Sequence, residues 1–130
     1  MIYFTFEELS KTSQKADNAI PNATVKANLE YLVDNLLDPI RKLWGKPIIV
    51  NSGYRSPEVN KLVGGAVNSQ HLKGEAADIT TGTAEGNRKL FEIIANSGLE
   101  FDQLIDEKNY RWLHISLKRE GNRKQIKHLK

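Results

Sequence analysis

The ten residues Ser69-Gln70-His71-Leu72-Lys73-Gly74-Glu75-Ala76-Ala77-Asp78 decide how this chain folds around its most reactive side chains. Gly74 can adopt a positive φ without steric cost, which predicts a turn directly after His71. The small residues Ala76 and Ala77 predict the start of a strand that continues to Thr80. A turn that leads into a strand can bring the imidazole of His71 and the carboxylate of Asp78 to one point.

The chain has only two other histidines, His114 and His128. His114 lies in the apolar run Trp112-Leu113-His114-Ile115-Ser116, which predicts a strand with the imidazole facing the fold or a cleft. Either His71 or His114 alone is typical of a structural histidine. Together with Asp78 they form a His₂Asp set, and imidazole and carboxylate are good zinc ligands. Three protein ligands leave a fourth position for water, which is the arrangement of a catalytic site.

The segments around this stretch predict an α+β fold with a small, mainly antiparallel sheet packed with helices. Apolar residues from Val25 to Trp44, at steps of three, four and one, predict one long helix. We expect a kink near Asn35, because Pro39 lacks a backbone donor. The predicted helices cover 4–12, 25–44, 56–64 and 84–97, and the predicted strands cover 48–50, 76–80, 101–107 and 112–117.

The composition fits one domain covering residues 1–130. Cysteine is absent, which excludes disulfides and thiolate nucleophiles and leaves His, Asp and Glu as metal ligands. No apolar run reaches the roughly 18 residues that a membrane-spanning helix needs. The net charge of +3 is uneven, since residues 118–130 hold six lysines and arginines against one acidic residue. No aromatic residues interleave with these charges, so a solvated terminal segment is favoured over a nucleic-acid site.

The pattern S-x-H-x-x-G-x-A-x-D, matched without a gap from Ser69 to Asp78, resembles the zinc D-Ala-D-Ala carboxypeptidase family. These peptidoglycan peptidases include phage endolysins and are related in fold to the Hedgehog signalling domain. The resemblance spans roughly Leu29 to Lys127 and has three further parts in order along the chain. They are Ser52-Gly53-Tyr54-Arg55-Ser56, the hairpin segments 101–105 and 112–116, and a terminal strand at Asn122-Arg123-Lys124-Gln125.

The resemblance implies one Zn²⁺ per chain, held by His71, Asp78 and His114. It also implies that Ser69 and Arg55 face the substrate. A guanidinium beside the metal can bind a peptide carboxylate or stabilise a developing oxyanion. An ion pair at the start of a helix is the structural alternative for Arg55.

The general base is where the sequence departs from the family. Many members carry an acidic residue three positions before the last histidine ligand, and here that position is Arg111, which cannot accept a proton at neutral pH. The nearest acids upstream are Asp106 and Glu107. Glu75 is a weaker candidate, because it is expected to lie on the surface of a loop.

The register of the hairpin determines which of the two acids, Asp106 or Glu107, lies on the same face as His114. With a loop of two or four residues, Glu107 pairs with Trp112 and lies on the same face as His114, because side chains alternate along a strand. Glu107 is therefore expected to be the general base. Gln103 lies on the same face and is expected to contact the substrate. A loop of three residues would put Asp106 on that face instead.

We therefore expect a zinc metallopeptidase that hydrolyses peptidoglycan stem peptides, of either the carboxypeptidase or the endopeptidase type. The alternative is a zinc-bound domain with little or no activity that recognises the cell wall or has a structural role. We expect a monomer with no nucleic-acid partner and no membrane span. The first residues lack the features of a secretory signal, so we expect synthesis in the cytoplasm and action on the wall after lysis or virion delivery.

Overall fold

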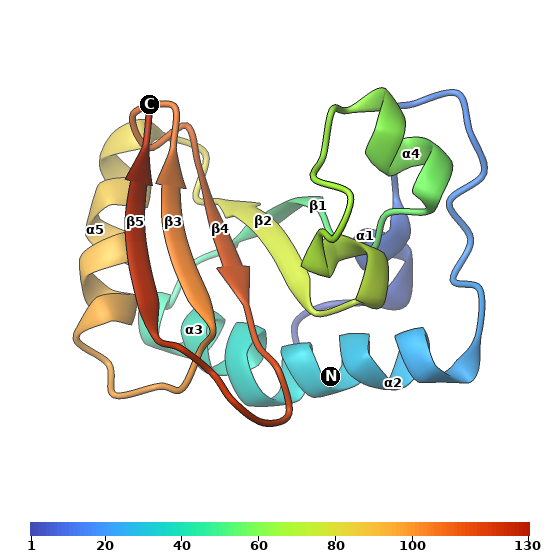
Figure 1. The fold of residues 1–130 in the computed structure, drawn as a ribbon. Helices are drawn as coiled ribbons and strands as arrows, with labels where there is room; N and C mark the ends of the chain where they lie inside the picture. Colours follow the sequence, from blue (N-terminus) through green and yellow to red (C-terminus); the bar gives the residue numbers. More distant parts are fainter.

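A five-stranded sheet with the strand order β1-β2-β4-β3-β5 forms the centre of the fold. The computed structural model describes every residue from Met1 to Lys130. Neighbouring strands are antiparallel except β3 and β5, which are parallel, and this confirms the predicted α+β class (Figure 1). The strands are β1 (Ile49–Ser52), β2 (Ala76–Thr80), β3 (Gln103–Glu107), β4 (Trp112–Ser116) and β5 (Gln125–Leu129).

The helices follow the predicted order, with one addition between α4 and β2. A short 3₁₀ turn, η2, occupies a segment expected to be a plain loop. None of the helices has the length and apolar character needed to cross a membrane. The helical elements are α1 (Phe6–Ser10), α2 (Ala23–Leu32), η1 (Val33–Leu37), α3 (Asp38–Trp44), α4 (Pro57–Leu62), η2 (Gln70–Lys73) and α5 (Ala84–Ala95).

The long helix predicted from Val25 to Trp44 is one continuous run interrupted by a π-helical turn, η1. Within that turn the backbone N–H of Asp38 donates to the carbonyl of Val33, five residues back. Pro39 explains the position of the turn, because its ring lacks the N–H that the carbonyl of Asn35 would otherwise accept. The expected kink is therefore realised as a wider turn.

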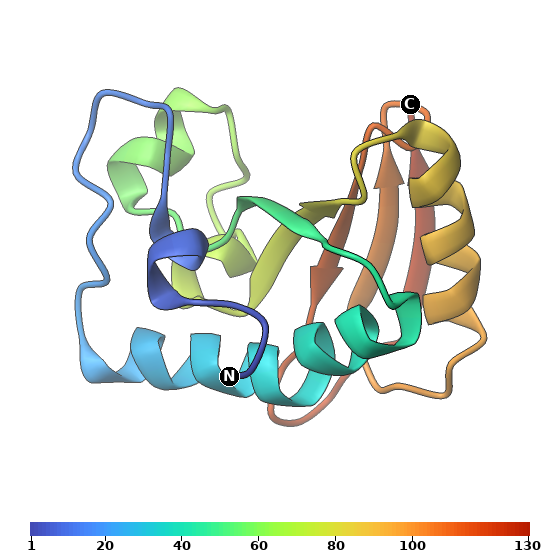
Figure 2. The same cartoon turned by 180° about the vertical axis from the view of Figure 1, so that it is seen from behind.

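One hydrophobic core of 22 buried residues joins these layers. The α2–α3 run lies along the base of the molecule, and α5 packs on one face of the β3–β4 hairpin (Figures 1 and 2). The opposite face of the hairpin looks toward α4 and η2 (Figure 1). The largest fully buried side chains belong to Phe101, Leu9, Leu29, Leu32, Leu36, Leu37, Ile40, Ile79, Leu90, Ile94, Leu104 and Leu113.

The loop between β3 and β4 has four residues, 108–111, and three of them have a positive φ of 52° to 63°. Such backbone angles are costly for residues other than glycine and persist where surrounding contacts enforce them. The buried Asn87 of α5 supplies two of those contacts, since its Nδ2 donates to the carbonyls of Tyr110 at 2.9 Å and Arg111 at 3.1 Å. Phe91 packs edge-on against the Tyr110 ring.

The basic end of the chain contains a strand that joins the sheet, but this strand lies at Gln125–Leu129 and shares only Gln125 with the segment 122–125 where the resemblance placed it. β5 runs parallel to β3 with Gln125 opposite Gln103. Before the strand, Arg123 donates to both carboxylate oxygens of Asp102, from Nε at 3.0 Å and from Nη2 at 2.8 Å. Asp102 is fully buried, so this paired contact fixes the start of β5.

Candidate metal centre and cleft

The side chains of His71, Asp78 and His114 converge from three different elements. One nitrogen or oxygen atom of each lies within 4.8 Å of the other two. Asp78 Oδ1 lies 3.3 Å from His71 Nε2 and 3.1 Å from His114 Nδ1. Asp78 of β2 and His114 of β4 are direct cross-strand neighbours, while His71 belongs to η2. The structure thus brings together the three residues predicted as metal ligands.

The turn before β2 is what returns His71 to the sheet. Ser69 caps η2 by accepting a hydrogen bond from the backbone N–H of His71. Gly74 ends η2 with a φ of 76°, and a Cβ there would lie 2.8 Å from the carbonyl oxygen of Val25. Only glycine fits both the backbone angle and this close approach to α2.

The hydrogen bond of His71 defines which ring nitrogen faces Asp78. Its Nδ1 lies 2.7 Å from the carbonyl oxygen of Gly53. A carbonyl oxygen can only accept, so Nδ1 carries a proton and Nε2 is the ring nitrogen that faces the carboxylate of Asp78. This donor set, oriented by an outer hydrogen bond, fits a bound Zn²⁺.

Arg55 holds the carboxylate of Asp78 from the side opposite the histidines. Its Nη2 donates to Asp78 Oδ2 at 2.9 Å, and its Nε donates to the Ser52 hydroxyl at 2.9 Å. The structural ion pair that was the alternative for Arg55 is therefore present. It leaves Oδ1 as the carboxylate oxygen directed at the two imidazoles.

The Asp78 carboxyl is almost fully buried, yet it stays ionised. Burial raises the pKa of Asp78, but the charges and hydrogen bonds of His71 and His114 lower it by more than burial raises it. The net pKa lies well below its usual range. The Asp78 carboxyl is thus anionic at neutral pH.

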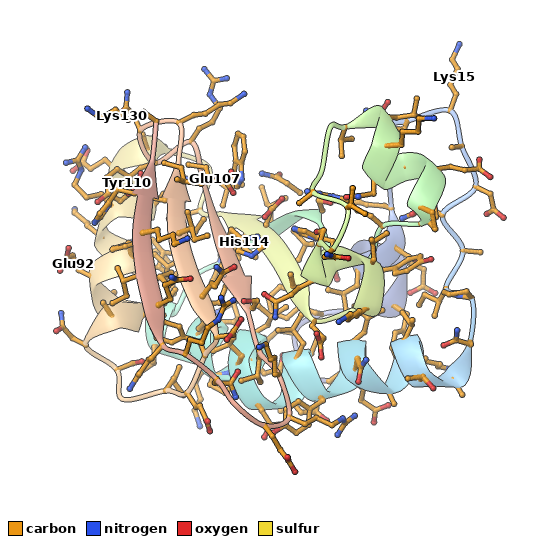
Figure 3. All side chains as sticks on the ribbon, viewed as in Figure 1. Lys15, Glu92, Glu107, Tyr110, His114 and Lys130 are labelled. Atoms are coloured by element: carbon orange, nitrogen blue, oxygen red, sulfur yellow. The ribbon has the colours of Figure 1, made fainter.

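An open cleft of about 560 Å³ lies over this cluster. The α4–η2 segment forms one wall and the β3–β4 hairpin forms the other. Glu107 lines the hairpin wall, and in Figure 3 Glu107 and His114 both lie on the side of the hairpin that faces α4. The predicted substrate residues Arg55, Ser69 and Gln103 also line the cleft.

The hairpin register is the one expected for a four-residue loop. Glu107 lies opposite Trp112, and Gln103 lies opposite Ser116. Asp106 faces the other side of the sheet, where its buried carboxylate contacts His128 Nδ1. His128 is therefore remote from the metal cluster, as expected.

The remaining candidates, Gln103, Ser69 and Glu75, differ in their hydrogen bonds and in whether they line the cleft. The side-chain Nε2 of Gln103 donates to Gln125 Oε1 at 2.8 Å. The side-chain oxygen Oε1 of Gln103 has no protein partner. The Ser69 hydroxyl serves as the cap of η2. Glu75 does not line the cleft, in keeping with its lower rank as a candidate base.

Two residues at the site were missed from the sequence. Trp112 lines the cleft, and its indole N–H donates to Glu107 Oε2 at 3.2 Å. The predicted register already placed these two residues opposite each other, so this contact had a signal in the sequence. Asn60 is buried beside Arg55 Nη1 at 3.4 Å, and no local pattern indicates that contact.

Comparison with known proteins identifies the family of this chain. The chain is 36% identical over 98 residues to a zinc D-Ala-D-Ala carboxypeptidase of Streptomyces albus G. The aligned segment covers 75% of this chain but only 38% of that relative. The sequence model of the peptidase M15 family matches residues 2–116, which include all three clustered side chains. With most of its length matched, the chain belongs to the peptidase M15 family.

Proposed function

We propose that this chain is a zinc-dependent peptidase that hydrolyses stem peptides of peptidoglycan. The observation that carries the proposal is the buried His71–Asp78–His114 cluster at the base of an open cleft. Membership of the peptidase M15 family supports the reaction class. The zinc D-Ala-D-Ala carboxypeptidase relative supports the metal and the substrate class.

In this proposal His71 Nε2, Asp78 Oδ1 and His114 Nδ1 hold the metal. Zn²⁺ bound there supplies Lewis acidity, which polarises the scissile carbonyl and makes water a stronger nucleophile. The Gly53 carbonyl keeps His71 in the tautomer that presents Nε2. Arg55 keeps Asp78 in the rotamer that presents Oδ1.

Glu107 is the proposed general base. It lies on the cleft face of the hairpin and forms no ion pair that would occupy its carboxylate. A carboxylate two strand positions from His114 along the ladder is within reach of a water in the cleft. Glu107 takes the proton of the attacking water and returns it to the amine that leaves.

Arg55, Ser69 and Gln103 are the proposed substrate contacts. Three of the N–H groups of Arg55 have protein partners, at Ser52, Asn60 and Asp78. Its remaining donors are available for a peptide carboxylate or for the oxyanion. The free side-chain oxygen of Gln103, Oε1, can accept a hydrogen bond from a peptide N–H of the substrate.

The second candidate is a zinc-bound domain that recognises the cell wall without cleaving it. The observation that favours it is Arg111, an exposed loop residue at the position where many family members carry the acid. Both functions predict zinc binding and affinity for the wall. Only turnover of a wall peptide therefore distinguishes them.

The test is mass spectrometry of muropeptides after incubation with zinc-loaded protein. A peptidase shortens or separates stem peptides, and the mass lost identifies the cleaved bond as terminal or internal. The matched control is the His114→Ala variant, which removes one proposed ligand. If the loaded protein binds purified wall and leaves every muropeptide mass unchanged, the recognition function replaces the peptidase.

A further inference from the structure

Trp112 and Glu107 form a pair at the rim of the cleft that the family assignment leaves without a role. Glu107 is the last residue of β3 and Trp112 is the first residue of β4, and the two lie directly opposite each other. Both side chains are partly exposed and both line the cleft. A glutamate at the end of a strand, beside open solvent, ordinarily samples several rotamers.

One hydrogen bond restricts this glutamate. The indole Nε1–H donates to Glu107 Oε2 at 3.2 Å, and Oε1 has no protein partner. Indole nitrogen is a donor only, so Glu107 Oε2 accepts this bond, and a hydrogen bond to a charged group is among the stronger kinds. One oxygen of Glu107 is thereby held, and the other remains free to accept a proton.

The backbone around the pair is fixed as well. Lys108, which follows Glu107, has a positive φ of 52° and donates its backbone N–H to the Leu129 carbonyl at 2.8 Å. Its Nζ lies 5.5 Å from the centre of the Trp112 ring, a cation–π distance. The indole is thus contacted by Lys108 on its face and by Glu107 at its N–H.

We propose that Trp112 is a positioning residue that holds the Glu107 carboxylate in place for proton transfer. This inference rests on the proposed peptidase function and on Glu107 as its base. Trp112 acts through Glu107 and takes no proton itself. Its loss therefore lowers the rate of the chemical step and leaves metal binding intact.

The contact itself is tested without any turnover. The chain has two tryptophans, so ¹⁵N-labelled zinc-loaded protein gives two indole N–H signals in the NMR spectrum. The Trp112→Phe variant assigns them. We expect Glu107→Ala to move the Trp112 signal and to leave the Trp44 signal in place. A Trp112 signal that does not move overturns the proposed contact.

The catalytic effect is tested with Trp112→Phe, which keeps an aromatic ring and removes the N–H. We expect kcat to fall about tenfold, the value of one hydrogen bond to a charged group, with KM within about twofold and zinc content unchanged. In the Glu107→Gln background the same substitution should have no further effect, because the two residues act as one unit.

Trp44 provides the matched control. It also has a lysine over its ring, with Lys46 Nζ at 5.1 Å, but no carboxylate accepts its N–H. Trp44→Phe should leave kcat, KM and zinc content unchanged.

Two kinetic results overturn the inference while leaving the peptidase function standing. A rise in KM with unchanged kcat assigns Trp112 to substrate binding. An undiminished effect of Trp112→Phe in the Glu107→Gln background shows that Trp112 does not act through Glu107. A wild-type chain that cleaves no wall peptide overturns the proposed function instead, and the NMR measurement decides the contact in either case.

Discussion

The sheet carries a histidine–aspartate contact on each of its two faces, and the two differ in almost every other respect. On the cleft face Asp78 meets His71 and His114, and all three side chains are mostly buried. On the face toward α5, Asp106 meets only His128. Both aspartates are buried, at 6% and 4% exposure, so burial of the carboxylate does not distinguish them.

The number of partners and the route to solvent do distinguish them. Asp78 has two imidazoles on one oxygen and Arg55 on the other, and an open cleft lies above. His128 packs against the Phe91 ring, and its side chain is 60% exposed at the edge strand. A histidine–aspartate contact is therefore common to both faces, whereas a cluster of three side chains that could hold a metal, beside an open cleft, occurs on one.

The largest effect is expected from a substitution of His114, which disrupts the cluster on the cleft face. His114→Ala removes one of three ligands, so we expect the purified protein to lose its zinc and all turnover. His128→Ala is the matched change on the other face and should keep one zinc per chain and near-normal turnover. Metal analysis by mass spectrometry measures the zinc content of both variants, and muropeptide cleavage measures their turnover. Full zinc content in His114→Ala would remove that residue from the ligand set.

The next largest effect separates the two acids at the end of β3. Glu107→Gln should lower turnover by about 10²–10⁴, the usual cost of losing a general base, with zinc content unchanged. Asp106→Asn should leave turnover within a few-fold, because Asp106 faces α5. Steady-state kinetics on a purified muropeptide measures both variants. The reverse result, with Asp106→Asn inactive, would show that the general base lies on the α5 face of the sheet and that Glu107 is not the base.

A smaller effect concerns the outer support of Asp78. Arg55→Met leaves all three ligands in place but removes the donor on Asp78 Oδ2. Loss of such a support typically weakens metal affinity about 10–100-fold. Competition with a chromogenic chelator measures the zinc affinity, and Arg123→Met, which removes the arginine of a different buried aspartate, should not change it. An unchanged affinity in Arg55→Met would restrict Arg55 to the substrate.

The smallest effect sharpens the comparison with a third buried aspartate, Asp102, whose partner is an arginine. Hydrogen bonds from Arg123 lower the pKa of Asp102 to about 2, against the opposing effect of burial. A carboxyl with a lowered pKa stabilises the folded state above its unfolded pKa of about 4 and loses that contribution as the pH falls toward 2. Melting temperatures of metal-free protein should therefore drop between about pH 5 and pH 2.

The control for this prediction is Arg123→Met. Without the guanidinium the pKa of Asp102 rises toward its ordinary value, so the variant should be less stable at neutral pH and lose less stability on acidification. Parallel pH dependences in the two proteins would show that Asp102 is not the titrating group. Removing zinc beforehand keeps metal release out of the measurement.

Local sequence patterns predicted the other helices and strands and grouped His71, Asp78 and His114, but they did not indicate η2 or β5. His71 and Asp78 are seven residues apart, and the glycine turn between them brings the two side chains together. Alternation along β3 and β4 then placed Glu107 on the face of His114. These inferences worked because each depends on neighbours in sequence or on the period of a strand.

Contacts between distant segments were beyond the same reasoning. Arg55 reaches Asp78 across 23 residues, and Asn87 reaches Tyr110 across 23 residues. Both depend on how the elements pack, which composition and periodicity do not specify. The parallel placement of β5, and with it the contact of His128 with Asp106, depends on the sheet order. The resemblance indicated a terminal strand but not its neighbour.

The π-helical turn η1 has a consequence for how the length of this chain can vary among its relatives. A π turn holds one residue more than the α-helical turn it replaces, and each residue of an α-helix rotates the next by about 100°. Deleting one residue within Val33–Leu37 would therefore return η1 to an ordinary α-helical turn and leave the buried Ile40 facing the core, whereas a deletion elsewhere in the run would turn α3 about its axis. Single-residue deletions should therefore be tolerated in the 11–22 segment and in η1 but excluded from α2 and α3, so the length of this helix can differ by one residue among relatives only at η1.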